Sequence, residues 1–237
     1  MDQSRRFAAP GQNRLLSALP RDLQLRLLPM LEKVSLPVRH VLTEAGVPLG
    51  HVWFPLSGVI SLVLAMKKGT SVDVGTVGNE GLVGTPVFLG ADRLPVTAVC
   101  QVAGQALKMR AESFRRALDE HPELNERVRR YTLGLMTSMS QSAACNQVHG
   151  VSERMCRGLL MTHDRVGADE FQLTQEFLAQ MLGLRRPSVT VAAGELQRAG
   201  LIRYHRGRIR VVDRAGLEAR ACECYETVRL ELDRLLA

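Results

Sequence analysis

The stretch from Gln172 to Val212 constrains the fold more than any other part of the sequence. Thr174 is a favourable N-cap, and an apolar face follows it at helical spacing as far as Gly183, where a helix can end in a left-handed turn. Pro187 stands near the first turn of a second helical pattern, which Gly200 closes. Two helices joined by a tight turn that contains glycine predict a helix-turn-helix.

The segment 201–212 predicts a β-hairpin directly after these helices. Apolar residues flank a turn at Gly207, and arginines surround its tip and outer face. These arginines are Arg203, Arg206, Arg208 and Arg210. A hairpin beside a helix-turn-helix is the arrangement of a winged helix.

Positive charge is concentrated in the same region. Residues 185–220 hold nine arginines and three acidic residues, a surplus of six in a chain with a net charge of +7. Such a block indicates a polyanionic partner, most often nucleic acid. Two packed helices with a solvated basic face would explain the helical pattern alone. The hairpin and the charge favour DNA binding.

The alternative is a ligand-binding β domain whose basic end binds RNA or another polyanion without sequence choice. Readers of single-stranded RNA need exposed aromatic side chains for stacking. Aromatic residues make up only 4% of the chain, and the basic block contains only Tyr204. An enzyme is not expected, since no catalytic arrangement of serine, histidine and acidic residues or of paired carboxylates stands out.

Residues 34–109 have the texture of an all-β domain. The expected strands are short aliphatic runs at 52–54, 59–65, 71–77 and 96–102, separated by glycine or proline. Within them Gly75, Gly78, Gly81 and Gly84 recur at every third residue. These glycines form either tight corners or a turn that cradles a ligand. They match neither a Walker loop nor a dinucleotide fold.

A helical region follows the predicted strands. A short helix is expected over 111–120 and a long one over 122–147, with another over 152–166. The long helix carries one apolar stripe, which can be buried against its own domain or against a partner helix. We predict that the stripe forms a dimer seam made of Leu124, Val128, Tyr131, Leu135 and Met139.

The chain resembles the Crp/Fnr family of bacterial transcription regulators. The resemblance rests on the motifs at 52–63 and 77–84, and above all on those at 173–183, 186–190 and 196–202. It implies an α+β protein: a jelly-roll (β-roll) sensor domain like that of cyclic-nucleotide-binding proteins at 1–120, a dimerisation helix at 121–147, a winged helix-turn-helix at 148–214 and a C-terminal helix at 215–237. It also implies a cytoplasmic homodimer that binds palindromic double-stranded DNA and RNA polymerase, without a membrane.

The same resemblance assigns roles to single residues. Arg186 takes the place of an arginine that contacts DNA at the start of the recognition helix, and Pro187 and Val191 replace two further base-reading positions, so the operator should differ. The full predicted DNA-binding set is Thr174, Gln175, Arg185, Arg186, Ser188, Val189, Thr190, Arg206 and Arg208.

The sensor side departs from relatives that bind cyclic AMP. Where they hold the nucleotide with a Glu and an Arg-Ser pair, this chain has Leu82, Val96 and Thr97, which leaves the cyclic phosphate without a charge partner. A conventional cyclic-AMP receptor is therefore not expected, and the effector is open. The candidate effector residues are Gly81, Leu82, Val83, Gly84, Val96 and Thr97.

The cysteines and histidines predict no cofactor. No Cys precedes Cys100, which argues against the N-terminal iron–sulfur cluster of oxygen-sensing relatives, and His40 and His51 more readily fit structural roles than haem ligation. Cys222 and Cys224 are too close in sequence for the usual zinc pair. We expect them to be packing residues, with redox responsiveness as the alternative.

Overall fold

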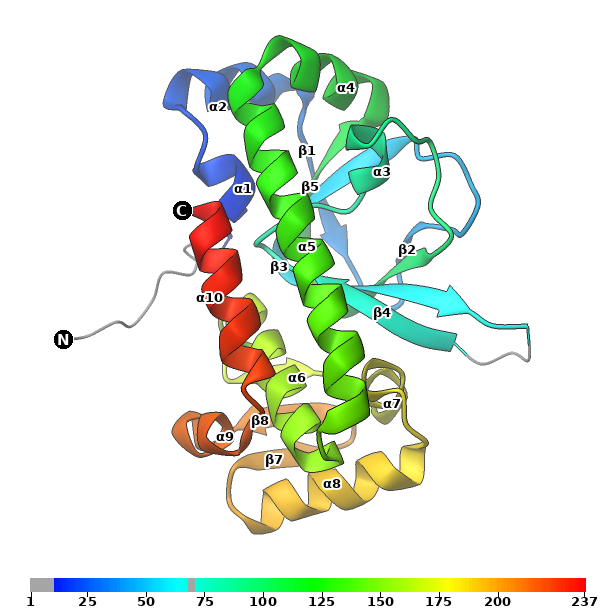
Figure 1. The fold of residues 1–237 in the computed structure, drawn as a ribbon, viewed down its shortest axis with the longest axis vertical. Helices are drawn as coiled ribbons and strands as arrows, with labels where there is room; N and C mark the ends of the chain where they lie inside the picture. The colour runs from blue at the N-terminus through cyan, green and yellow to red at the C-terminus, as the bar shows by residue number, and fades with distance from the viewer. Residues whose placement is uncertain (1–10, 68–70) are drawn as a thin grey trace, which may run out of the picture.

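A computed structural model describes residues 11–67 and 71–237 of the chain as a mixed helix and sheet protein (Figure 1). Its first part begins with short helices and a 3-10 turn, continues through five strands and a short helix, and ends with α4. The elements are α1 (Arg14–Ser17), α2 (Arg21–Leu27), η1 (Leu28–Met30), β1 (Glu32–Leu36), β2 (Val41–Thr43), β3 (His51–Ala65), β4 (Ser71–Val77), α3 (Thr85–Phe88), β5 (Thr97–Arg110) and α4 (Ala111–Glu120).

The strands form an antiparallel sheet in the order β1-β5-β3-β4, and β2 also pairs with β5. The runs predicted at 52–54 and 59–65 belong to a single strand, β3. Pro55 and Gly58 bend this strand where its register against β5 shifts, and Gly58 has a φ of 82°. Irregular residues in a long strand therefore mark bulges here and do not end it.

The long helix α5 (Pro122–Val148) runs along the β domain and buries its main apolar stripe there (Figure 1). Leu124, Val128, Tyr131 and Leu135 belong to the same hydrophobic core as Phe54 and Phe114. Met139 packs against this core from the same face. Leu124, Val128, Tyr131 and Leu135 therefore do not form the predicted dimer seam, because their side chains are buried inside the protomer, whereas Met139 is half-buried.

The second part of the chain forms a smaller domain with its own core. It comprises α6 (Val151–Val166), β6 (Glu170–Gln172), α7 (Gln175–Leu182), α8 (Arg186–Arg198), β7 (Ile202–His205), β8 (Arg208–Val211) and α9 (Arg214–Arg220). The three strands pair in the order β6-β8-β7. The C-terminal helix α10 (Cys224–Leu236) then returns alongside α5 (Figure 1).

The two cores meet, because Val59 and Val102 of the β domain pack into the core of the smaller domain. Helix α6 contacts β3, and α7 contacts β4. Among the residues that the structure describes, no helix combines the length and the apolar character needed to cross a bilayer.

Candidate nucleic-acid interface

Helices α7 and α8 are positioned by the local signals expected of a helix-turn-helix. The hydroxyl of Thr174 accepts a hydrogen bond from the amide of Phe177 and caps α7. Gly183 ends α7 in the left-handed region at φ 61°, and the next amide, of Leu184, donates to Ala179 O at 2.9 Å. This turn directs the following helix across α7.

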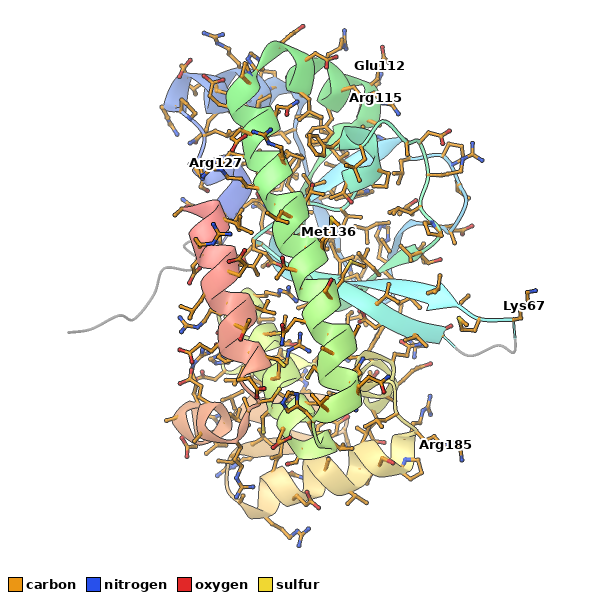
Figure 2. The ribbon with its side chains drawn as sticks, viewed as in Figure 1. Lys67, Glu112, Arg115, Arg127, Met136 and Arg185 are labelled. Atoms are coloured by element: carbon orange, nitrogen blue, oxygen red, sulfur yellow. The ribbon has the colours of Figure 1, made fainter. Side chains whose placement is uncertain are left out.

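One face of α8 holds the helix in the domain, and the other is free. Val189, Ala192 and Leu196 are buried in the core of the smaller domain. The outer face presents Arg185, Arg186, Ser188 and Thr190, all exposed. Arg185 points away from the molecule at the beginning of α8 (Figure 2).

Val189 is a correction to the predicted DNA-binding set. Its side chain is fully enclosed at 0% exposure, so it cannot reach a base or a phosphate. Helical periodicity explains the difference, because Val189 lies on the buried face with Ala192 and Ala193, whereas Ser188 and Thr190 lie about 100° to either side of it and are exposed.

The wing, which is the hairpin formed by β7 and β8, lies next to the start of α7. Arg206 and Gly207 connect β7 to β8 with φ values of 47° and 78°, the two positive angles of a type I′ hairpin turn. Gly207 O accepts a hydrogen bond from Leu173 N at 2.8 Å, which ties the turn to the residue before the α7 cap. The turn that carries the exposed Arg206 therefore lies beside Thr174, and Arg208 is exposed one residue after Gly207.

Two acidic residues pair with arginines of this surface. Glu176 on α7 contacts Arg39 of the β domain at 2.6 Å and Arg186 of α8 at 3.7 Å. Glu170 on β6 contacts Arg208 of the wing at 3.4 Å. Sequence analysis did not identify these carboxylates, because Arg39 and Arg208 are far from them along the chain.

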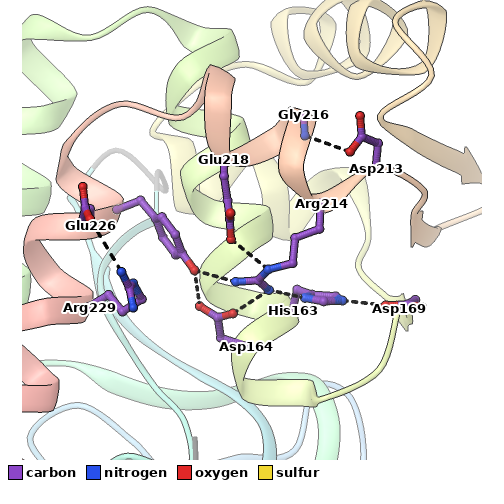
Figure 3. A network of polar contacts seen from close by, with 10 residues as sticks. His163, Asp164, Asp169, Asp213, Arg214, Gly216, Glu218, Glu226 and Arg229 are labelled. Atoms are coloured by element: carbon purple, nitrogen blue, oxygen red, sulfur yellow. Dashed lines mark hydrogen bonds and ion pairs between the residues drawn. The ribbon is translucent and has the colours of Figure 1, made fainter. Parts of the chain in front are cut away.

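A polar network holds α9 and the first turn of α10 to α6 (Figure 3). Arg214 lies at its centre and contacts Asp164 at 2.8 Å and Glu218 at 2.9 Å, and donates to the hydroxyl of Tyr225 at 2.8 Å. That hydroxyl donates to Asp164 at 2.8 Å. His163 extends the network, because its Nδ1 atom contacts Arg214 and its Nε2 atom contacts Asp169 Oδ1 at 2.9 Å. This arginine is thereby structural, unlike the exposed arginines of α8 and the wing.

The predicted effector residues are mostly enclosed. Leu82, Val83 and Val96 are buried in the core of the β domain, so these three candidate effector residues do not present their side chains to solvent. Gly81 and Gly84 are buried as well, and Thr97 is half-buried. A Cβ atom at Gly81 would clash with the ring of Tyr131, so this glycine permits the close approach of α5.

The glycine-rich segment receives an arginine from the smaller domain. Arg165 of α6 donates to Glu80 at 2.6 Å and to Thr76 O at 3.1 Å, and both charged side chains are only 8% exposed. A side chain at Gly78 would collide with the aliphatic part of Arg165. The segment is thus an interdomain contact as well as a set of tight turns.

Both parts of the chain match known domain families. Residues 33–121 match the cyclic nucleotide-binding domain, and residues 153–220 match the Crp-like helix-turn-helix domain, in that order. The chain belongs to the Crp/Fnr family. It is a DNA-binding transcription regulator, and the resemblance seen in the sequence is confirmed.

Individual relatives agree with this assignment. A CRP-like cAMP-activated global transcriptional regulator of Mycobacterium tuberculosis is 22% identical over 81% of this chain and 88% of its own. The transcriptional regulator SdrP of Thermus thermophilus is 26% identical over 79% of this chain and 93% of its own. The expected class, a regulator and not an enzyme, is confirmed by this family membership.

Solved structures share the fold. FixK2 from Bradyrhizobium japonicum superposes with a TM-score of 0.70 at 14% identity, covering 81% of this chain and 98% of that protein. The c-di-GMP-responsive regulator CLP of Xanthomonas campestris gives a TM-score of 0.65 at 16% identity, covering 81% and 99%. The α+β architecture expected for this Crp/Fnr protein, with its β-roll, long helix and winged helix-turn-helix, is confirmed.

Proposed function

We propose that this regulator acts as a homodimer that reads a two-fold symmetric DNA site with α8 in the major groove and the wing on the phosphates. The exposed face of α8 carries the proposal. Arg186, Ser188 and Thr190 project from its first turns, and residues 184–194 include no acidic side chain that would repel DNA. Arg206 at the wing tip supplies a phosphate contact beside this face.

The second stripe of α5 supports the dimer. Leu133 is 50% exposed and Met136 is 60% exposed. They lie on a different face of α5 from the stripe that packs on the β domain. The exposed positions follow each other at alternating intervals of four and three residues, the heptad spacing of a two-helix seam. They are Arg129, Leu133, Met136, Ser140, Ala143 and Gln147. A second copy of α5 fits this face, because a two-fold axis places Leu133 and Met136 against their own equivalents.

We further propose that the effector is not cyclic AMP bound in the conventional way. Leu82 and Val96 are buried apolar side chains at the positions where a cyclic phosphate needs a charge partner. The relatives named as cAMP-activated and c-di-GMP-responsive indicate that effectors vary among similar chains. The outcome of nucleotide addition is therefore part of the test.

Selection of binding sites from random double-stranded DNA tests the proposal. We expect an enriched palindrome whose half-sites are about one helical turn, roughly 34 Å, apart. Arg186→Ala should lose about 1–3 kcal/mol of specific binding, because it removes a base or phosphate contact. Arg115→Ala is the matched control, since Arg115 is exposed on α4 at the opposite end of the molecule from α8 (Figure 2).

The same selection distinguishes the alternatives. Cyclic AMP and cyclic di-GMP are added in separate arms, and equal enrichment with and without cyclic AMP is expected. A site that appears only with cyclic AMP would contradict the effector proposal. Binding of single-stranded RNA in preference to duplex DNA, or a DNA affinity unchanged by Arg186→Ala, would contradict the assigned role of α8.

A further inference from the structure

Four potential metal ligands from distant parts of the chain meet at the end of α5. Cys145 lies in the last turn of α5, and His149 follows the helix directly. Cys222 lies in the connection between α9 and α10, and Cys224 is the first residue of α10. One ligand atom of each residue lies within 4.8 Å of the others. The three cysteines are buried and form a small cluster of their own, apart from both hydrophobic cores.

The distances in the cluster suit a single tetrahedral ion. With zinc–sulfur bonds near 2.3 Å and zinc–nitrogen bonds near 2.0 Å, tetrahedral ligand atoms stand about 3.8 Å apart for two sulfurs and about 3.6 Å apart for sulfur and nitrogen. Here Cys145 Sγ lies 3.5 Å from Cys222 Sγ, and Cys224 Sγ lies 3.7 Å from His149 Nδ1. These two of the six distances match a tetrahedral zinc site, and all four ligand atoms lie within 4.8 Å of one another.

The surroundings orient the ligands as in zinc proteins. His149 Nε2 contacts the carboxylate of Glu223 at 3.0 Å, which leaves Nδ1 directed toward Cys224. A carboxylate on the far nitrogen of a ligating histidine fixes its tautomer and its ring orientation. Gln141 Nε2 donates to Cys224 Sγ at 3.0 Å and so orients the Cys224 thiol as well. A packing cluster alone does not need such polar partners.

Charge also favours a divalent cation. Three thiolates, a neutral imidazole and Zn²⁺ leave one negative charge in a buried place, and this charge needs a cation nearby. Arg157 of α6 is 9% exposed and donates to Ser142 Oγ of α5 at 2.7 Å, three residues before Cys145. Its Nε atom is shielded from solvent and has no hydrogen-bond partner in the described part of the chain.

We propose that Cys145, His149, Cys222 and Cys224 form a structural zinc site. The Cys-x-Cys spacing at 222–224 does not reveal such a site, because the second pair of ligands is contributed by a helix 77 residues earlier. The signal in the sequence is the spacing of four residues between Cys145 and His149, which brings them together at the end of α5, where the His149 amide donates to Cys145 O at 3.1 Å. The site would link the α5–α6 junction to the start of α10.

Metal content and cobalt substitution test the site directly. Protein purified under reducing conditions should hold about one zinc per chain. Replacement by Co²⁺ should give the visible absorption of a tetrahedral ion together with thiolate charge-transfer bands. Cys222→Ala and Cys145→Ala should lose the metal and the spectrum. Cys156→Ala is the matched control, because Cys156 is equally buried but lies outside the cluster.

A conservative pair of variants separates metal binding from folding. Glu223→Gln should weaken zinc binding roughly ten- to a hundredfold by releasing His149, with little change in the folded structure. Glu226→Gln on the same helix should have no effect, since its partner is Arg229. Three results would overturn the proposal: wild-type protein that takes up neither ion, a cobalt spectrum that survives Cys222→Ala, or a Cys145–Cys222 disulfide in place of metal.

Discussion

Arg165 and Glu80 form a buried ion pair that joins the DNA-binding domain to the β domain. The guanidinium donates to both carboxylate oxygens, at 2.6 Å and 3.2 Å, and Glu80 also accepts from the amide of Gly78 at 3.0 Å. Because Arg165 lies near the end of α6 and Glu80 lies in the glycine-rich segment, the pair fixes the orientation of one domain against the other.

Loss of either partner should destabilise the protein strongly. Arg165→Met or Glu80→Gln leaves the remaining group buried without its partner, a change that typically costs about 3–5 kcal/mol of unfolding free energy. The double variant should cost much less than the sum of the two, because no uncompensated charge remains. Urea denaturation of the four proteins measures this coupling.

Asp22→Asn is the control for this cycle. Asp22 pairs with Arg26 on α2 at 3.5 Å, and both side chains are about two-thirds exposed. Its loss should be nearly neutral, because exposed pairs contribute little. Additive effects of the Arg165 and Glu80 changes would show that the two groups do not act as a pair.

Gly81→Ala should disrupt the contact between the β domain and α5. An added methyl group meets the ring of Tyr131, whose hydroxyl donates to Leu82 O at 3.2 Å. Overpacking of this kind typically costs about 1–3 kcal/mol. Thermal unfolding should show a lower melting temperature for Gly81→Ala than for Gly50→Ala, because Gly50 has open space around it. Equal melting temperatures would contradict the close packing.

Leu133→Asp combined with Met136→Asp should convert the dimer to a monomer. The change places four charges across a two-fold seam, where like charges repel and lose their hydration. Analytical ultracentrifugation should give the dimer mass for the wild type and the monomer mass for the variant. Leu89→Asp is the control, since Leu89 is 64% exposed on the β domain. A monomeric wild type at micromolar concentration would contradict the α5 seam.

Asp73 should make stability depend on pH near neutrality. Burial raises the pKa of this carboxyl from 3.8 to about 7, and its Oδ2 atom is shielded from solvent without a hydrogen-bond partner among the described residues. The folded state therefore holds a proton that the unfolded state releases between these values. The free energy of unfolding should fall as the pH rises from about 4 to about 7, by on the order of 4 kcal/mol if the whole shift is expressed.

Asp73→Asn should remove this dependence. The amide resembles the protonated acid and keeps an oxygen for the amide of Gly75, which lies 2.9 Å from Asp73 Oδ1. At pH 8 the variant should be more stable than the wild type, and at pH 4 the two should be similar. Urea denaturation at a series of pH values measures the difference. If the unfolding free energies of the wild type and Asp73→Asn change with pH in the same way, the titrating group is not Asp73.

Features set by neighbouring residues were predictable from the sequence. The Thr174 cap, the Gly183 turn and the Arg206–Gly207 hairpin each depend on a few consecutive residues, and the structure has all of them. The helix expected over 111–120 has the same bounds in the structure. Local backbone preferences decide such elements, whatever the rest of the chain does.

Features that depend on which surfaces meet were not predictable. The apolar stripe of α5 has the same period whether it faces its own domain or a partner, and only the structure shows Leu124 and Val128 buried in the protomer. The Arg165–Glu80 pair spans 85 residues, and the Cys145–Cys222 contact spans 77. No periodicity or spacing along the chain brings such residues together.

The carboxylate of Glu176 also bears on how the protein searches DNA. It contacts Arg186 on the recognition helix and Arg39 on the sensor domain, so it stands in for a phosphate before DNA arrives. If Arg186 binds DNA as proposed, it must leave this carboxylate for a phosphate or a base. The contact is 3.7 Å long and its side chains are 64% and 41% exposed, so breaking it costs little. Glu176 therefore holds Arg186 in the absence of DNA and releases it readily.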